Sequence, residues 1–229
     1  MKKSKKILLT VIMAGILIAS AGVVTYAWFT SETEAHGKMV NGTLQINDGE
    51  DIETPMFDGD QFLPSQLEYG NWLTLSNTGG LDTYLKATYS HSVDKATLED
   101  YKVGYMAMKY TTQPGEDVYE ESEIELANLF EGTTNERPTT FDAPEGVEIV
   151  GGILTGEQAT TVMNSDSGEF VVGEGIDDDS FWGLEEGQYI DVMFGLKMDE
   201  HAGNEHQGAT YDATLNVIAK QTDDGSEFE

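Results

Sequence analysis

The chain has 229 residues and no cysteine, and its 42 acidic residues outnumber its 12 basic ones to give a formal net charge of −30. So large a negative charge repels nucleic acid and anionic membrane surfaces, which excludes nucleic acid as a partner. Without cysteine there is neither a disulfide nor a thiol nucleophile. The length suits one domain with a packed core.

The N-terminus has the pattern of an export signal. Four lysines form a basic head: Lys2, Lys3, Lys5 and Lys6. Residues 7–24 carry no charge, and Thr25 and Ala27 place small side chains where a signal peptidase reads the chain. We therefore expect residues 1–27 to be a signal peptide cut between Ala27 and Trp28, and the protein to be secreted to the extracellular matrix or the cell surface. The alternative is a retained anchor, since the uncharged stretch is barely long enough for a ~30 Å hydrocarbon core.

Removal of the signal makes the chain still more acidic. The remaining 202 residues hold 8 basic and 42 acidic side chains, a net charge near −34. Such a charge favours solubility and opposes self-association unless salt screens it or cations bridge it. Residues 223–229 are polar and acidic, and we expect a disordered tail there.

Alternation of apolar and polar residues predicts strands over most of the chain. The expected strands are 38–47, 71–76, 83–91, 103–110, 188–199 and 209–221, with shorter ones at 147–150 and 169–172. The pattern of the last two long strands predicts a hairpin closed by the loop 200–208. Each strand is expected to have one solvent-exposed face, which in the strand 188–199 carries Asp191 and Lys197. Ser122 is the predicted N-cap of a short helix.

These elements predict an all-β fold: a jelly-roll-like antiparallel β-sandwich over residues 38–222, with a short helix and an irregular insertion at about 132–179. The insertion is expected because this stretch is rich in glycine and contains Pro138 and Pro144. Polar residues dominate the preceding segment, 28–37, which has poor strand alternation.

Three stretches carry a family resemblance. They are TYAWF at 25–29 followed by NGTLQI at 41–46, LTLSNTGGL at 73–81, and GLEEG at 183–187 with Gln207-Gly208 before the last strand. In this order and spacing the chain resembles the TasA/CalY (camelysin) family of biofilm matrix fibre proteins. It departs from the family at Pro64-Ser65-Gln66, where the family has a P-G-D turn, and at 132–179, which has no counterpart.

The resemblance implies a jelly-roll subunit exported with a signal peptidase of the SipW type. It further implies that the segment 28–37 is a donor strand for the next copy, so that the partners are other copies of the chain and, as a candidate, a minor matrix or anchor protein. The donor residues are then Trp28, Phe29, Thr30, Ser31, Glu32, Thr33 and Glu34. Large aromatics contribute most when buried at an interface, so Trp28 and Phe29 are the expected plugs. The alternative is a flexible start to the first strand.

Two other functions are weaker hypotheses. A camelysin-type metalloendopeptidase needs His-Glu-x-x-His, which is absent; the nearest sequence, His201 to His206, reads as a solvated loop with incidental histidines. We expect no catalytic residues and no enzyme activity. A carbohydrate-binding module needs an exposed aromatic row. The aromatic residues available for one are Trp72, Tyr84, Tyr89, Tyr105, Phe181, Trp182 and Tyr189. They read more simply as core residues.

Calcium is the one candidate cofactor. Glu174, Asp177, Asp178 and Asp179 cluster hard oxygen ligands in one stretch, and residues 47–60 hold a second acidic group. Neither has the spacing of a dedicated calcium loop, so solvated acidic loops are the favoured interpretation.

Overall fold

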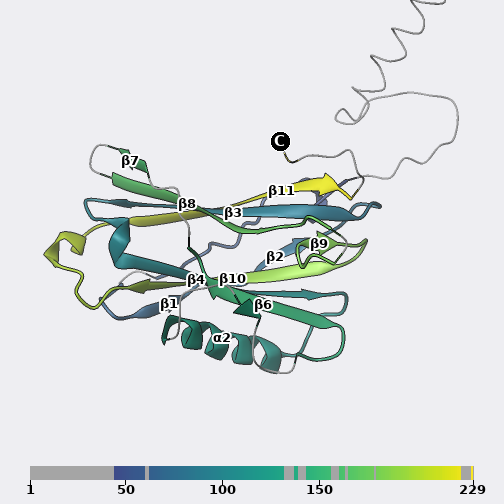
Figure 1. Cartoon of the computed structure of the whole chain (residues 1–229), viewed down its shortest axis with the longest axis horizontal. Coiled ribbons are helices and arrows are strands. Elements are labelled where there is room, and N and C mark those ends of the chain that lie inside the picture. Colours follow the sequence, from purple (N-terminus) through teal and green to yellow (C-terminus); the bar gives the residue numbers. More distant parts are fainter. Residues whose placement is uncertain are drawn as a thin grey trace, which may run out of the picture. The chain divides into compact units, whose positions relative to one another are not determined.

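Two antiparallel sheets stack face to face in the computed structural model, which describes residues 44–59, 62–131, 137–138, 143–155, 160–162, 165–177, 179–222 and 228 (Figure 1). The predicted all-β sandwich is confirmed. The signal peptide, the segment 28–37 and nearly all of the tail lie outside the described residues. Within the described ranges, no helix is long and apolar enough to cross a membrane.

The six-stranded sheet is built around two long central strands. Its order is β1 (Leu67–Tyr69), β10 (Tyr189–Met198), β4 (Tyr101–Tyr110), β6 (Val147–Ile153) and β5 (Arg137–Pro138). A further strand, β2 (Leu73–Ser76), pairs with the other half of β10. Because β4 occupies one side of β10 along its whole length, β1 and β2 together form the opposite edge.

The five-stranded sheet has the order β11 (Tyr211–Gln221), β3 (Thr83–Asp94), β8 (Ser165–Glu174) and β7 (Thr160–Val162), with β9 (Gly183–Leu184) also paired to β3. Side chains of β3 and β10 that alternate inward fill the space between the sheets: Leu85, Ala87, Tyr89, Val192, Phe194 and Leu196 are all buried. This burial of apolar area is what holds the two layers together.

The helix α2 (Glu116–Glu131) covers the outer face of the six-stranded sheet (Figure 1). A second core lies beneath it, made of Met106, Met108, Met193, Leu126 and Leu129 with smaller contributions from β6. The prediction that Ser122 caps the helix is wrong. The helix begins six residues earlier, after Gly115, because Val118 also packs on the sheet. Ser122 is buried and its Oγ donates to the carbonyl of Val118 at 2.7 Å.

Two predictions about the last strands are also wrong. β10 and β11 do not pair, because β10 already has neighbours on both sides within its own sheet while β11 pairs with β3. The second face of β10 is not exposed to solvent either, because α2 covers it and leaves Asp191 only 3% exposed. The connection between β10 and β11 therefore crosses from one sheet to the other.

The region expected as an irregular insertion contributes β6, which pairs with β4, and β8, which pairs with β3 over most of its length. Of the strand expected at 38–47, the described part shows a single bridge between Ile46 and Asn77, followed by a 3-10 turn over Asn47–Gly49.

Candidate functional site

The outer edge of β11 is the first feature of interest. β11 is 11 residues long and ends the strand order of its sheet, so within the described part of the chain it is paired only on its β3 side. Its inward residues pack against the main core but stay half-buried: Tyr211, Ala213, Leu215, Val217 and Ala219. Along residues 212–219 the outer side of β11 has no strand beside it among the described residues, and the apolar row behind it is only half-buried. Such an edge can accept a further strand through its backbone N–H and C=O groups.

A cavity of about 790 Å³ opens where β11 begins. Both sheets line it, through Glu68 on β1, Tyr101 on β4 and Leu196 on β10 from one sheet and Tyr211 on β11 from the other. The remaining lining residues are Phe57, Gly59, Phe62, Leu63, Pro64, Met198, Ala202, Gly203, Asn204, His206, Gln207, Gly208, Ala209 and Thr210. Much of this lining is apolar and aromatic, as in pockets that bury a side chain of a ligand.

One wall of the cavity is the connection from β10 to β11, residues 199–210, which we call the strap; it forms the left end of the sandwich in Figure 1. Both ends of the strap are held by backbone contacts. The amide of Asp199 donates to the carbonyl of Asp100 at 2.7 Å, and Asp94 exchanges backbone and side-chain bonds with Thr210. The hydrogen bond that the Thr210 amide donates to the Asp94 carboxylate is the main cause that holds the pKa of Asp94 below its ordinary value.

The middle of the strap is held by a histidine. His206 Nε2 lies 2.7 Å from a carboxylate oxygen of Asp100, and His206 Nδ1 lies 3.1 Å from the hydroxyl of Tyr101. Because a carboxylate only accepts hydrogen bonds, Nε2 carries a proton. In the neutral ring Nδ1 then accepts from the Tyr101 hydroxyl. Burial, followed by the charges of Asp100 and Asp94, raises the pKa of Tyr101, so its hydroxyl keeps its proton at neutral pH.

The contacts continue from Tyr101 into the five-stranded sheet. Tyr101 packs against Tyr211 with ring centroids 5.1 Å apart, and the Tyr211 hydroxyl lies 2.7 Å from Nδ1 of His91 and 3.1 Å from the Tyr89 hydroxyl. His91 itself is buried in the sandwich. The hydrogen bonds of Tyr211 with His91 and Tyr89 therefore hold the aromatic side chains that line the cavity in place.

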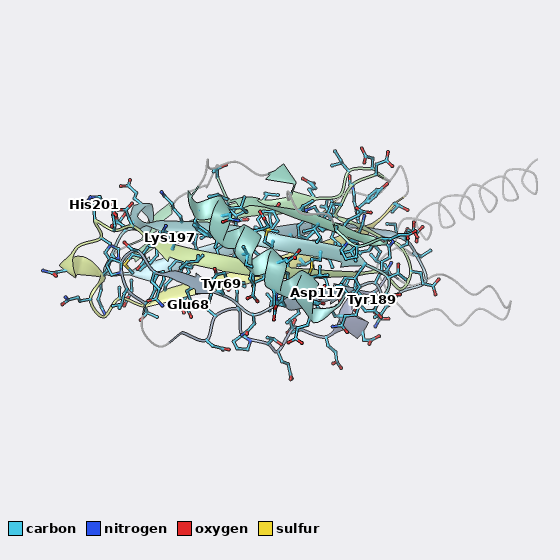
Figure 2. All side chains as sticks on the ribbon, turned by 90° about the horizontal axis from the view of Figure 1, so that it is seen from below. Glu68, Tyr69, Asp117, Tyr189, Lys197 and His201 are labelled. Atoms are coloured by element: carbon cyan, nitrogen blue, oxygen red, sulfur yellow. The ribbon has the colours of Figure 1, made fainter. Side chains whose placement is uncertain are left out.

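The two histidines of the strap have opposite environments, and the prediction of incidental solvated histidines holds for only one. The side chain of His201 is 84% exposed, next to Asp199, and lies near the left end of the molecule in Figure 2. The side chain of His206 is only 4% exposed. Sequence reasoning missed His206 because its partner, Asp100, is 106 residues away. The one hint of this site in the local sequence is that Tyr101 and Tyr211 are the first residues of β4 and β11.

The calcium candidates do not converge among the described residues. Glu174 faces Lys86 at 4.0 Å, and Asp177 accepts from the Ser180 hydroxyl at 2.9 Å within its own turn. Asp179 is exposed, and Asp178 lies outside the described residues. In the part of the chain that the structure describes, no group of three or more His, Asp or Glu side chains is placed to hold a metal ion.

The aromatic residues considered for sugar binding belong mostly to the core, since Tyr84, Tyr89, Tyr105 and Trp182 are all buried. Tyr189 is 36% exposed and stacks on Tyr110. The predicted cleavage residues Thr25, Ala27 and Trp28, and the predicted donor residues 28–34, lie outside the described residues.

Compared with family models, curated proteins and solved structures, the chain matches none.

Proposed function

We propose that this protein is a secreted structural subunit that polymerises head to tail into extracellular matrix fibres, without catalysis. In this proposal the segment 28–37, freed by cleavage after Ala27, adds as a strand to the β11 edge of the next subunit. The observation that carries it is the coincidence of an 11-residue edge strand with a cavity of about 790 Å³ at its start. An added strand would pair the backbone groups of β11 and cover its half-buried apolar row.

The dimensions agree with this proposal. At ~3.3 Å per residue, the 11 residues of β11 extend about 36 Å and the ten residues 28–37 reach about 33 Å. The segment therefore suits the length of the edge, and Trp28 and Phe29 are the residues whose burial in the aromatic cavity would contribute most. Donation from one copy to the next does not close on itself, so it produces filaments.

Charge sets the conditions for assembly. Subunits with a net charge near −34 repel one another, and we expect salt or divalent cations to promote polymerisation by screening or bridging. The proposed partners are thus other copies of the chain, with a SipW-type signal peptidase acting during export and a minor matrix or anchor protein as a further candidate.

The test compares two purified proteins, residues 28–229 and residues 37–229, by electron microscopy and sedimentation across a range of salt and calcium concentrations. We expect filaments from the first only. The second should remain a folded monomer, and a synthetic peptide of residues 28–37 should bind to it. Normal filaments from residues 37–229 would contradict strand donation. Bound zinc together with chelator-sensitive proteolysis would instead support the camelysin-type enzyme.

A further inference from the structure

The strap that forms one wall of the cavity is held at its middle by the buried side chain of His206, and strand donation by itself does not explain this arrangement. The strap supplies eight of the residues that line the cavity, and it contains Gly203 and Gly208, the latter with a φ of +69°. Its ends are fixed by Asp100 and Asp94. Between them, among the described residues, the hydrogen bonds to the rest of the domain are those of His206 and a longer one from Lys95 Nζ to the Gly208 carbonyl at 3.5 Å.

A loop of this composition and length has many conformations open to it, and each fixed residue costs backbone entropy. A cavity that must be ordered by the incoming strand binds that strand more weakly than one already formed. The two contacts of the buried His206 ring, to Asp100 and to Tyr101, therefore keep the wall in place before the strand arrives. Their loss would also release Tyr101, whose ring packs on Tyr211 across the cavity.

We infer that His206 is the positioning residue of the strand-acceptor cavity: through Asp100 and Tyr101 it holds the strap in the shape that admits a neighbouring copy's segment 28–37. This inference rests on the proposed function. In this inference His206 helps a subunit to accept a strand from its neighbour and plays no part when the subunit donates its own segment 28–37. His206→Gln should therefore damage only one end of a subunit, because the donor segment of the variant is intact.

This asymmetry provides a readout that general destabilisation would not produce. A subunit that donates normally but accepts weakly should add to the acceptor end of a wild-type filament and then slow its further growth. Small amounts of His206→Gln protein, mixed into the wild type as residues 28–229, should shorten the filaments measured by electron microscopy. Alone, the variant should need a concentration about tenfold higher to polymerise, as expected for the loss of one of the two hydrogen bonds of the ring, because a single glutamine amide cannot reproduce both.

His201→Gln is the matched control, because it changes the same side chain in the same strap at an exposed position. It should leave filament length and the polymerisation threshold unchanged within about twofold, the usual scale of neutral surface substitutions. Hydrogen exchange of the monomers should show faster exchange in residues 199–210 for His206→Gln only, with β3, β4 and β10 still protected.

The outcomes separate the two ideas. If wild-type protein forms no filaments under any condition, the proposed function fails and takes the inference with it. If wild-type filaments form but His206→Gln assembles at the wild-type threshold, the proposed function stands and the inference is rejected. A variant that neither polymerises nor shortens wild-type filaments also rejects the inference, because its defect then extends beyond acceptance.

Discussion

The hydroxyl of Tyr119 on α2 lies 2.6 Å from the carboxylate of Asp191 on β10, and the same carboxylate also accepts from Tyr110 at 2.9 Å and from Thr74 at 2.6 Å. Asp191 is 3% exposed, and no cation pairs with it among the described residues. Three hydroxyl donors thus replace the water that a buried carboxylate loses. They join the helix, the centre of the sheet and its β2 edge at one point.

Asp191→Asn should therefore destabilise the fold. The amide keeps one acceptor oxygen but turns an NH₂ group toward hydroxyls that were donating, so at least one hydroxyl loses its partner. We expect a loss of about 2–3 kcal/mol in the free energy of unfolding, measured by urea denaturation, and about 1–2 kcal/mol for Tyr119→Phe. Tyr189→Phe, at a more exposed tyrosine, should change stability by less than about 0.5 kcal/mol. Equal effects for all three variants would contradict an anchoring role for Asp191.

Alkaline pH should weaken the same region. Burial, with the nearby Asp191 carboxylate, raises the pKa of Tyr110 and of Tyr119 above the ordinary value of 10.0. A raised pKa in the folded state means that the contribution is fully present below pH 10 and is lost as the pH rises through the folded-state pKa. The urea midpoint should therefore fall above pH 10. The fall should be smaller in Tyr119→Phe; an identical fall would show that Tyr119 is not one of the groups responsible.

Gly173 lies so close to the Trp182 ring that adding a side chain at residue 173 should destabilise the fold. A Cβ added at Gly173 would collide with the indole ring of Trp182, which belongs to the main core. Gly173→Ala should cost about 1–3 kcal/mol or more in the free energy of unfolding, because the buried indole must move. Gly80→Ala is the control, since a Cβ there meets nothing within 4 Å. Thermal unfolding of the two variants should separate them by several degrees.

The site of strand addition can be mapped by engineered disulfides, because the natural chain has no cysteine. A Ser31→Cys protein mixed with an Asn216→Cys protein should form a heterodimer on oxidation, detected by non-reducing electrophoresis, if the donor lies along β11. Val171→Cys is the matched control: it lies on β8, with Thr88 of β3 between it and Asn216, and is exposed. If Ser31→Cys instead cross-links preferentially to Val171→Cys, the donor does not lie along β11.

Period-two alternation determined the strands β3, β4, β10 and β11 to within a few residues, since a strand with a buried face imposes that pattern locally. Alternation does not encode which strands pair, so it could not show that β10 and β11 belong to different sheets. Nor could it show that α2 covers Asp191, because the charge at that position is satisfied by hydroxyls from three other elements.

The sequence by itself determined the excess of negative charge and the sandwich, both of which follow from composition and near-neighbour pattern. Only the tertiary structure decided which histidine of the strap is buried and which of the described strands ends its sheet. The physical reason is that His206 is held by Asp100 and Tyr101 across more than a hundred residues of chain, and that among the described strands β11 pairs with β3 alone.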